Sequence, residues 1–387
     1  MRAIEFLRSA EAAQQAYELD LSELVGIDSG SNDVAGVNRV ADWVQRRLLG
    51  LGFTVERRAS AETGVGDTLI GRRSGTGAHT VLMFAHMDTV FDIGDAAARP
   101  FSVDADGLAH GPGVTDDKAG VVAGLHAAAH LIANEHEPYK ELVFVCTPDE
   151  EIGSSVGGPV LQELAETADV AFCLECAREN GDLVISRKGA VDLDLEVLGK
   201  AAHSGIEPER GAHAGLEAAH LTIFLQELAD PENRLTVNVG ILRAGDRTNI
   251  VPDRALLRVE ARAPLAATLA EMMQKLQDRA DSPVVAGTTI SVTVVDDCPP
   301  LEETAHSKAL GAMAVGIASE LGFQPGLART GGVSDANRVA VLGVPTLDGL
   351  GPVGGGDHTP TEWLDLGSVP QRVALLATLI ARSQEIL

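Results

Sequence analysis

Short, continuous apolar runs alternate with helical patterns in the N-terminal part of the chain, and this alternation constrains the fold more than any other feature. The runs lie at 81–85, 142–146 and 170–174, and helical patterns lie at 41–53 and 119–133. A strand that is apolar at every position is buried on both faces, which is typical of a parallel sheet covered by helices. The pattern therefore predicts an α/β domain with a mostly parallel sheet, whose site lies beyond the carboxyl ends of the strands.

A different pattern begins at Gly189, where apolar and charged residues alternate as in a strand with one solvated face. The order βαββαβ then continues to about residue 298, which predicts a ferredoxin-like antiparallel sheet with both helices on one face. The chain has 387 residues, so two domains are expected. We expect an inserted domain, 189–298, within a larger domain formed by 1–188 and 299–387.

Composition excludes several classes of function. Acidic residues outnumber basic ones 56 to 30, for a formal net charge of −26, and aromatic residues make up 3%. Such a surface repels nucleic acids and anionic membranes, and it offers few rings on which bases could stack. We find no signal-peptide pattern, no apolar run of about 18 residues and no disulfide framework among the four cysteines. These features predict a cytoplasmic protein without nucleic-acid or membrane partners.

Histidine and carboxylate residues follow each of the three apolar runs. His86 and Asp88 follow the first run, Glu150 and Glu151 follow the second, and Glu175 ends the third. Each motif alone has an ordinary explanation, such as an unrelated loop Asp near a strand-end His, or adjacent carboxylates on a solvated loop. Since the carboxyl ends of neighbouring parallel strands meet at one edge, the motifs together favour a metal site, beside which a glutamate can take a proton from water.

Two glycine-rich loops add further candidate ligands. Asp116 and Asp117 stand between a Gly-Pro-Gly sequence and a helix, where either carboxylate could cap that helix, an explanation that is strong for Asp117. A carboxylate there could instead bridge two cations. His358 follows three glycines, which makes a core position improbable for it. Histidines and carboxylates without thiolates suit zinc, with manganese or cobalt as substitutes, and five ligands with one shared make two sites.

Two competing patterns carry less weight. Cys173 and Cys176 have C-x-x-C spacing but no second pair, so we interpret them as buried packing residues. His126 and His130 lie four apart on a helix, yet Ala127 stands where the metalloprotease motif H-E-x-x-H has glutamate. We therefore expect these histidines to be packed or exposed rather than metal-bound.

The ordered motifs resemble a known family. HMDTV, GPGVTDDKAG, TPDEEIGS, GKAAHSG, TNIVP and GGGDH, which span nearly the whole chain, are similar to motifs of the zinc exopeptidases and amidohydrolases. That family includes carboxypeptidase G, aminoacylase, acetylornithine deacetylase, succinyl-diaminopimelate desuccinylase and peptidase T. The proline of GPG and the double Asp resemble the glutamate carboxypeptidase branch most.

This resemblance implies a two-zinc metallopeptidase that cleaves an amide bond and releases a free amino acid. The alternatives are an N-acyl amino acid deacylase, a di- or tripeptidase, and a catalytically silent binding homologue. The resemblance also implies a catalytic domain with an inserted lid and dimerisation domain, and hence a homodimer. The substrate is expected to be a small peptide or an N-acyl amino acid.

Carried over residue by residue, the resemblance implies specific roles at the metal site. It assigns His86 and Glu175 to one zinc, Glu151 and His358 to the other, Asp116 to both, Asp88 to orienting His86, and Glu150 to general base catalysis. In the family the peptide bond after the bridging Asp is often cis, and we expect this between Asp116 and Asp117.

The resemblance also implies a set of substrate-binding residues: His203, Asn249, Arg262, Gly331 and Gly332, with Asp335 in the same loop as the two glycines. His203 resembles a group that polarises the scissile carbonyl in a partner subunit's site. Arg262 would grip the carboxylate of the product, although a surface salt bridge at a strand end would equally explain it. Arg187 and Lys188 could favour an acidic substrate side chain or form a hinge salt bridge.

Overall fold

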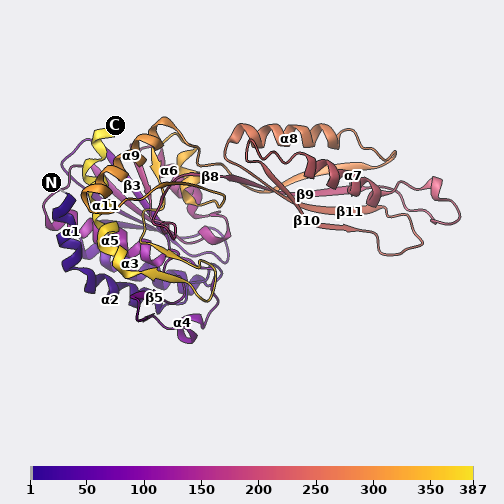
Figure 1. The fold of residues 1–387 in the computed structure, drawn as a ribbon. Helices are drawn as coiled ribbons and strands as arrows, with labels where there is room; N and C mark the ends of the chain where they lie inside the picture. The colour runs from indigo at the N-terminus through magenta and orange to yellow at the C-terminus, as the bar shows by residue number, and fades with distance from the viewer. Residues whose placement is uncertain (1–2, 387) are drawn as a thin grey trace. The chain divides into compact units, whose positions relative to one another are not determined.

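The computed structural model describes residues 3–386, which form two compact units. The first unit comprises residues 3–185, 303–330 and 334–386, and the second comprises 186–302 and 331–333. Figure 1 shows the course of the chain through both. The predicted mixed α/β architecture is confirmed.

A mostly parallel sheet forms the centre of the first unit, with the strand order β1-β2-β6-β3-β7-β14. Strands β6, β3, β7 and β14 run parallel to one another. Strand β2 pairs antiparallel with β6, and β1 pairs antiparallel with β2. Each predicted apolar run lies in or ends within a residue of a central strand. The bounds are β1 (Thr54–Arg58), β2 (Thr68–Ser74), β3 (Thr80–His86), β6 (Glu141–Thr147), β7 (Val170–Cys173) and β14 (Thr346–Leu347).

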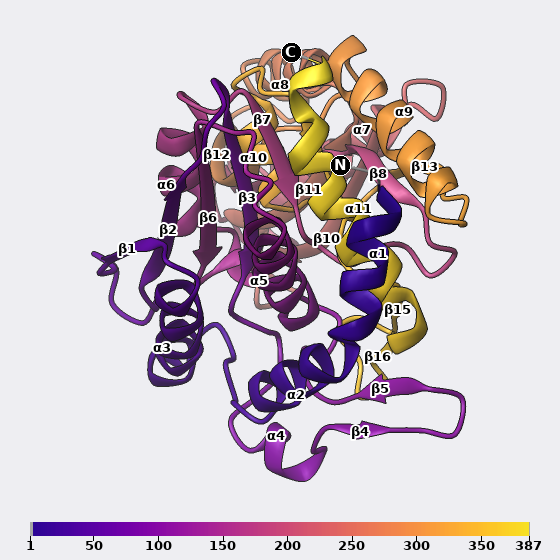
Figure 2. The ribbon, with the colours of Figure 1, turned by 90° about the vertical axis from the view of Figure 1, so that its left-hand side faces the viewer.

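Helices cover both faces of this sheet. Val81, Met83 and Ala85 of β3 belong to a core that includes α1, α3, α5 and α11, and Figure 2 shows α1, α5 and α11 alongside one another. Burying each large apolar side chain stabilises the fold by about 1.5–3 kcal/mol. The helices are α1 (Ala3–Ala12), α2 (Gln14–Val25), α3 (Val34–Gly50), α4 (Asp95–Ala98), α5 (Lys118–Ala133), α6 (Gly157–Ala165), α9 (Ala305–Glu320), α10 (Asp335–Ala340) and α11 (Val369–Arg382).

A small antiparallel sheet, with the order β15-β16-β5-β4, brings two glycine-rich loops together. Trp363 pairs with His110, so the loop that follows β5 lies beside the segment that precedes β16. A further pair joins β13 to β8. The bounds are β4 (Ser102–Val103), β5 (Leu108–His110), β8 (Leu183–Arg187), β13 (Leu327–Thr330), β15 (Gly354–Gly355) and β16 (Trp363–Asp365).

The second unit has its own sheet, β10-β11-β9-β12, in which every neighbouring pair is antiparallel. Leu221 of α7 and Leu276 of α8 belong to the same core as Leu193 and Leu195 of β9, so both helices cover one face, as predicted. The bounds are β9 (Gly189–Leu198), α7 (Ala214–Glu227), β10 (Thr236–Ala244), β11 (Arg254–Ala263), α8 (Ala266–Ala280) and β12 (Thr289–Cys298). Across residues 3–386, we find no helix with the length and apolar character needed to cross a membrane.

Candidate metal and catalytic site

The sheet order brings the sequence motifs together. Strand β3 lies between β6 and β7, and it pairs with both in parallel. His86 is the last residue of β3 and pairs with Thr147 at the end of β6, so the short 3-10 helix Glu150–Ile152 begins just beyond it. Glu175 leaves β7 on the opposite side. The three strand exits therefore converge on His86.

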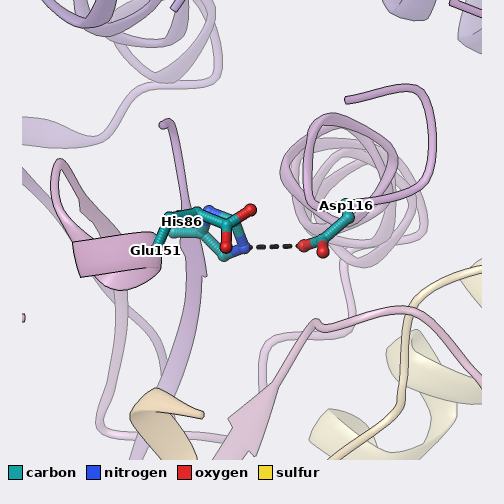
Figure 3. Close-up of side chains that lie close together, drawn as sticks. All are labelled: His86, Asp116 and Glu151. Atoms are coloured by element: carbon teal, nitrogen blue, oxygen red, sulfur yellow. Dashed lines mark hydrogen bonds and ion pairs between the residues drawn. The ribbon is translucent and has the colours of Figure 1, made fainter. Parts of the chain in front are cut away.

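His86 lies at the centre of the resulting cluster and is 2% exposed. Its Nε2 atom lies 2.9 Å from Oδ1 of Asp116 and 3.7 Å from Oε1 of Glu175. Figure 3 shows His86 and Asp116 joined by this hydrogen bond, with Glu151 beside them. Ligand atoms of His86, Asp116 and Glu151 lie within 4.8 Å of one another, and so do those of His86, Glu150 and Glu175.

Asp116 faces a second histidine with its other oxygen. Nε2 of His358 lies 3.2 Å from Oδ2 of Asp116 and 3.1 Å from Oε2 of Glu151. His358 has a positive φ of 62°, and the preceding glycines allow the chain to turn toward the cluster. The carboxylate of Asp116 thus stands between two histidines, with a glutamate beside each.

The donor set fits divalent cations. Burial and the charge of Asp116 raise the pKa of Glu151 to about 7, and burial together with the charge of Glu175 raises the pKa of Glu150 well above its ordinary range. Oε1 of Glu151 is buried and makes no hydrogen bond with described residues. Such crowded carboxylates repel one another, and cations coordinated between them would offset that repulsion. The oxygen and imidazole donors suit zinc, manganese or cobalt.

Asp88 connects the cluster to its surroundings and is fully buried. Its carboxylate accepts hydrogen bonds from the Ser31 hydroxyl at 2.7 Å and from the backbone N–H groups of Glu150 and Glu151 at 3.1 and 3.2 Å. It also lies 3.3 Å from Nδ1 of His86. One side chain therefore fixes both the histidine ring and the start of the glutamate pair. No motif in the sequence marks the contact with Ser31.

The helix-capping explanation for Asp117 is wrong. Asp117 stands at the N-cap position of α5, but its side chain makes no capping hydrogen bond. Its Oδ2 atom instead accepts the backbone N–H of His86 at 3.3 Å, because the carboxylate points back toward the end of β3. The peptide bond between Asp116 and Asp117 is cis, as expected.

The residues expected to bind substrate belong to the second unit. His203 is exposed, and its Nδ1 accepts the backbone N–H of Gly205 at 3.1 Å. Asn249 is also exposed. It lies near His203, because the backbone carbonyl oxygen of Asn249 accepts the N–H of Ser204. These contacts leave both side chains at the surface of this unit.

Arg262 and the glycine loop also lie in the second unit. Arg262 forms an ion pair with Glu260 and donates a hydrogen bond to the carbonyl oxygen of Gly331 at 3.0 Å. Gly332 follows in the same loop. Asp335, at the start of α10 in the first unit, is 3% exposed and accepts hydrogen bonds from Thr147 and Ser154. Its carboxylate points into the protein and supports the end of β6 instead of facing substrate.

The competing sequence patterns have structural explanations. Cys173 and Cys176 are buried, as predicted. Nδ1 of His130 forms a hydrogen bond with the Ser9 hydroxyl at 2.8 Å, and Nε2 of His126 lies 3.0 Å from Oδ2 of Asp20. Both histidines thus contact the N-terminal helices, which agrees with the expectation that they pack.

Comparisons with known proteins agree with the motifs. The sequence model described as "Peptidase family M20/M25/M40" matches residues 82–382. Carboxypeptidase G2 of Pseudomonas sp. (strain RS-16) is 32% identical over 376 residues, which cover 96% of this chain and 90% of that protein. A succinyl-diaminopimelate desuccinylase of Phenylobacterium zucineum (strain HLK1) is 28% identical over 368 residues, covering 88% of this chain and 92% of that protein.

The solved structures show the same relationship. Aminopeptidase PepT from Bacillus cereus ATCC 10987 superposes with a TM-score of 0.79 at 27% identity, covering 96% of this chain and 99% of that one. The family match spans well over half of the chain, and the resemblance seen in the motifs is confirmed. The chain therefore belongs to peptidase family M20/M25/M40 and is a metallohydrolase that acts on peptide or amide C–N bonds.

Proposed function

We propose that this metallohydrolase holds two zinc ions and cleaves an amide bond beside a free carboxylate, releasing an amino acid as a glutamate carboxypeptidase does. The observation that carries the proposal is the position of Asp116, whose two oxygens lie 2.9 Å from His86 and 3.2 Å from His358. A carboxylate between two histidines is suited to bridge two cations. The 32% identity to carboxypeptidase G2 supports the proposed type of reaction.

In this proposal His86 and Glu175 hold one cation, Glu151 and His358 hold the other, and Asp116 contacts both. Cations at these positions would polarise the scissile carbonyl and lower the pKa of a water molecule toward about 7. Binding needs neutral histidines and ionised carboxylates; Asp88 holds His86, and the strand ends and glycine-rich loops carry the other ligands. Cobalt or manganese would substitute for zinc at the same donors.

Glu150 is proposed as the general base. Its backbone N–H is fixed by Asp88 at 3.1 Å, and its carboxylate lies within 4.8 Å of ligand atoms of His86 and Glu175. There it can take a proton from the attacking water at a carboxylate oxygen and pass it to the leaving nitrogen. The same geometry would also let Glu150 serve as a ligand, and metal content distinguishes these roles.

Residues of the second unit are proposed to bind the substrate. Arg262 would hold the free carboxylate, His203 and Asn249 the scissile carbonyl, and the loop with Gly331 and Gly332 the neighbouring backbone. We propose that 1–188 and 299–387 form the catalytic domain and 189–298 a lid through which two chains dimerise. A cytoplasmic location likewise stays a prediction.

A cavity in the first unit is suited to the acyl side of the substrate. It has a volume of about 350 Å³, lies next to Glu151 and includes no lysine or arginine among its described lining residues. The apolar side chains of this lining suit an uncharged acyl group, because burying an unpaired carboxylate against them is costly. The α-ammonium group of a di- or tripeptide would also suit its acidic lining, which makes a peptidase the second candidate. The cavity is lined by apolar Val90, Phe91, Ile93 and Ile152 and by Asp33 and Asp92.

Replacement of Glu150 tests the proposed mechanism. We expect Glu150→Gln to lower kcat by about 10²–10⁴-fold while the zinc content, measured by atomic emission, stays at that of the unmodified protein. Glu163→Gln is the matched control, because Glu163 is an exposed glutamate paired with Arg58 on the surface. Retained activity would refute the role of Glu150 as base, and lost zinc would make it a ligand.

Removal of metal tests the site as a whole. Dialysis against a chelator should abolish hydrolysis of N-acyl glutamates and of dipeptides, and added zinc or cobalt should restore it. Circular dichroism before and after dialysis controls for unfolding. Full activity in demonstrably metal-free protein would contradict the proposal.

A further inference from the structure

Glu362 links the two glycine-rich loops of the candidate site. It stands between β15 and β16, four residues after His358, and is 1% exposed. Its Oε2 accepts the backbone N–H of Gly113 at 2.9 Å, and its Oε1 accepts those of Thr115 and Asp116 at 2.8 and 3.0 Å. One buried carboxylate thus satisfies three donors on the loop that carries Asp116.

These donors need such a partner. The loop has no regular secondary structure at Gly113, whose φ is 70°, and buried N–H groups without an acceptor are costly. Lys118 holds the same loop from its other side, since its ammonium group donates to the carbonyl oxygens of Ile27 and Pro112 at 2.8 and 3.2 Å.

We infer that Glu362 is a positioning residue, which sets the carboxylate of Asp116 at the correct distance from His358. Asp116 and His358 come from loops far apart in the chain, and Glu362 belongs to the segment of one while it binds the backbone of the other. The pairing of Trp363 with His110 joins the two segments independently of Glu362, so loss of the carboxylate leaves the sheet in place. The inference rests on the proposed metal-binding role of Asp116.

The test uses the full-length protein and two substitutions. Glu362→Ala removes both acceptor oxygens and all three hydrogen bonds, whereas Glu362→Gln keeps one oxygen but turns an NH₂ group toward a backbone donor. Asp365→Ala is the matched control, because Asp365 lies in the same segment and its side chain accepts only the local N–H of Gly367, at 2.8 Å, among described contacts. Zinc affinity is measured on metal-free protein by competition with a chelating dye, and the visible spectrum is recorded after loading with cobalt.

We expect Glu362→Ala to weaken zinc binding by about 10- to 100-fold and to change the cobalt spectrum. Glu362→Gln should show a smaller change of the same kind, and Asp365→Ala should match the unmodified protein. If Glu362→Ala does not fold, the Gln variant decides by the same two measurements. A lower melting temperature with unchanged zinc affinity and an unchanged spectrum would overturn the inference.

Asp116→Asn separates this inference from the proposed function. If that variant binds zinc as the unmodified protein does, the proposed ligand set fails whatever Glu362 does. If Asp116→Asn weakens zinc binding and the Glu362 variants do not, only the positioning role is refuted.

Discussion

The carboxylate of Asp88 lies 3.3 Å from Nδ1 of His86, and the carbonyl oxygen of Asp88 lies nearer, at 3.0 Å. Both atoms are acceptors, so Nδ1 carries a proton, and Nε2, which faces Asp116, is left as the ring nitrogen that would bind a cation. The geometry supports the orienting role proposed for Asp88, and it adds the backbone carbonyl as a second acceptor.

Replacing Asp88 should therefore impair metal binding and turnover together. Asp88→Asn keeps the size of the side chain but removes its charge and one of its acceptor atoms. We expect kcat/KM to fall by about 10- to 100-fold, with weaker zinc affinity in a dye competition assay. Ser31→Ala, which removes a single hydrogen bond to the same carboxylate, should have a smaller effect. Unchanged kinetics and affinity in Asp88→Asn would contradict the role.

Arg262 should affect KM more than kcat if it holds the carboxylate of the substrate. Arg262→Lys loses the planar fork that binds a carboxylate with two hydrogen bonds, which are worth about 1.5–3 kcal/mol to a charged partner. We expect KM for N-acyl glutamates to rise by about 10- to 100-fold. Arg258→Lys on the same strand, where Arg258 is paired with Asp194, is the control. Equal KM values for both variants would refute the assignment.

The cavity beside Glu151 predicts which acyl groups are accepted. The apolar side chains of its lining should disfavour a succinyl carboxylate, so N-acetyl and N-benzoyl amino acids should be hydrolysed faster than N-succinyl ones. Ile93→Lys introduces a cation at a lining position that is 73% exposed and should reduce this difference. Ile223→Lys, at an exposed position of α7, should leave it unchanged. Faster hydrolysis of succinyl substrates by the unmodified protein would refute the prediction.

His130 should make the stability of the fold depend on pH. Burial, followed by the charge of His126, lowers the pKa of His130 from its ordinary value of 6.5 to about 4. As the pH falls, His130 is therefore protonated in the unfolded chain before it is protonated in the folded chain. The contribution of neutral His130 to the free energy of unfolding is complete above pH 6.5 and is lost between pH 6.5 and about 4. The loss is at most about 3 kcal/mol.

Chemical denaturation at pH 7 and pH 4.5 measures this effect. His130→Gln should lose less stability between the two values than the unmodified protein does, because the residue that takes up the proton is gone. His220→Gln on the exposed surface of α7 should lose as much as the unmodified protein. Equal losses in all three proteins would show that His130 does not contribute.

The central strands could be predicted from the sequence because their apolar residues are buried without interruption, and α5 because most of its small apolar residues are buried. Helix α3 begins at Val34, earlier than the predicted position 41, because Asp33 caps it by accepting the N–H of Gly36. Strand β1 could not be recognised, since its residues are half-buried or exposed and it is an edge strand of the sheet.

Some residues of the candidate site could likewise be predicted from the sequence, and others could not. His86 and Glu151 could be proposed because they stand where buried strands end, and Asp116 and His358 because they stand in glycine-rich loops. Glu362 could not be found, because its partners are backbone N–H groups and no side-chain pattern marks them. The capping prediction for Asp117 is wrong because its carboxylate, which would normally accept an N–H group of its own helix, accepts the N–H group of His86 at the end of β3.

The position of β3 between β6 and β7 has a consequence for the stability of the folded chain. The acidic residues that follow β6 and β7 lie near His86 only when all three strands are hydrogen-bonded in register. The unfolded chain therefore does not contain the site. A ligand that binds only the native form adds RT ln(1 + [L]/Kd) to its stability, about 2.7 kcal/mol at a hundredfold excess over Kd. Divalent ions bound at these residues would therefore stabilise the folded chain against unfolding as well as take part in its reaction.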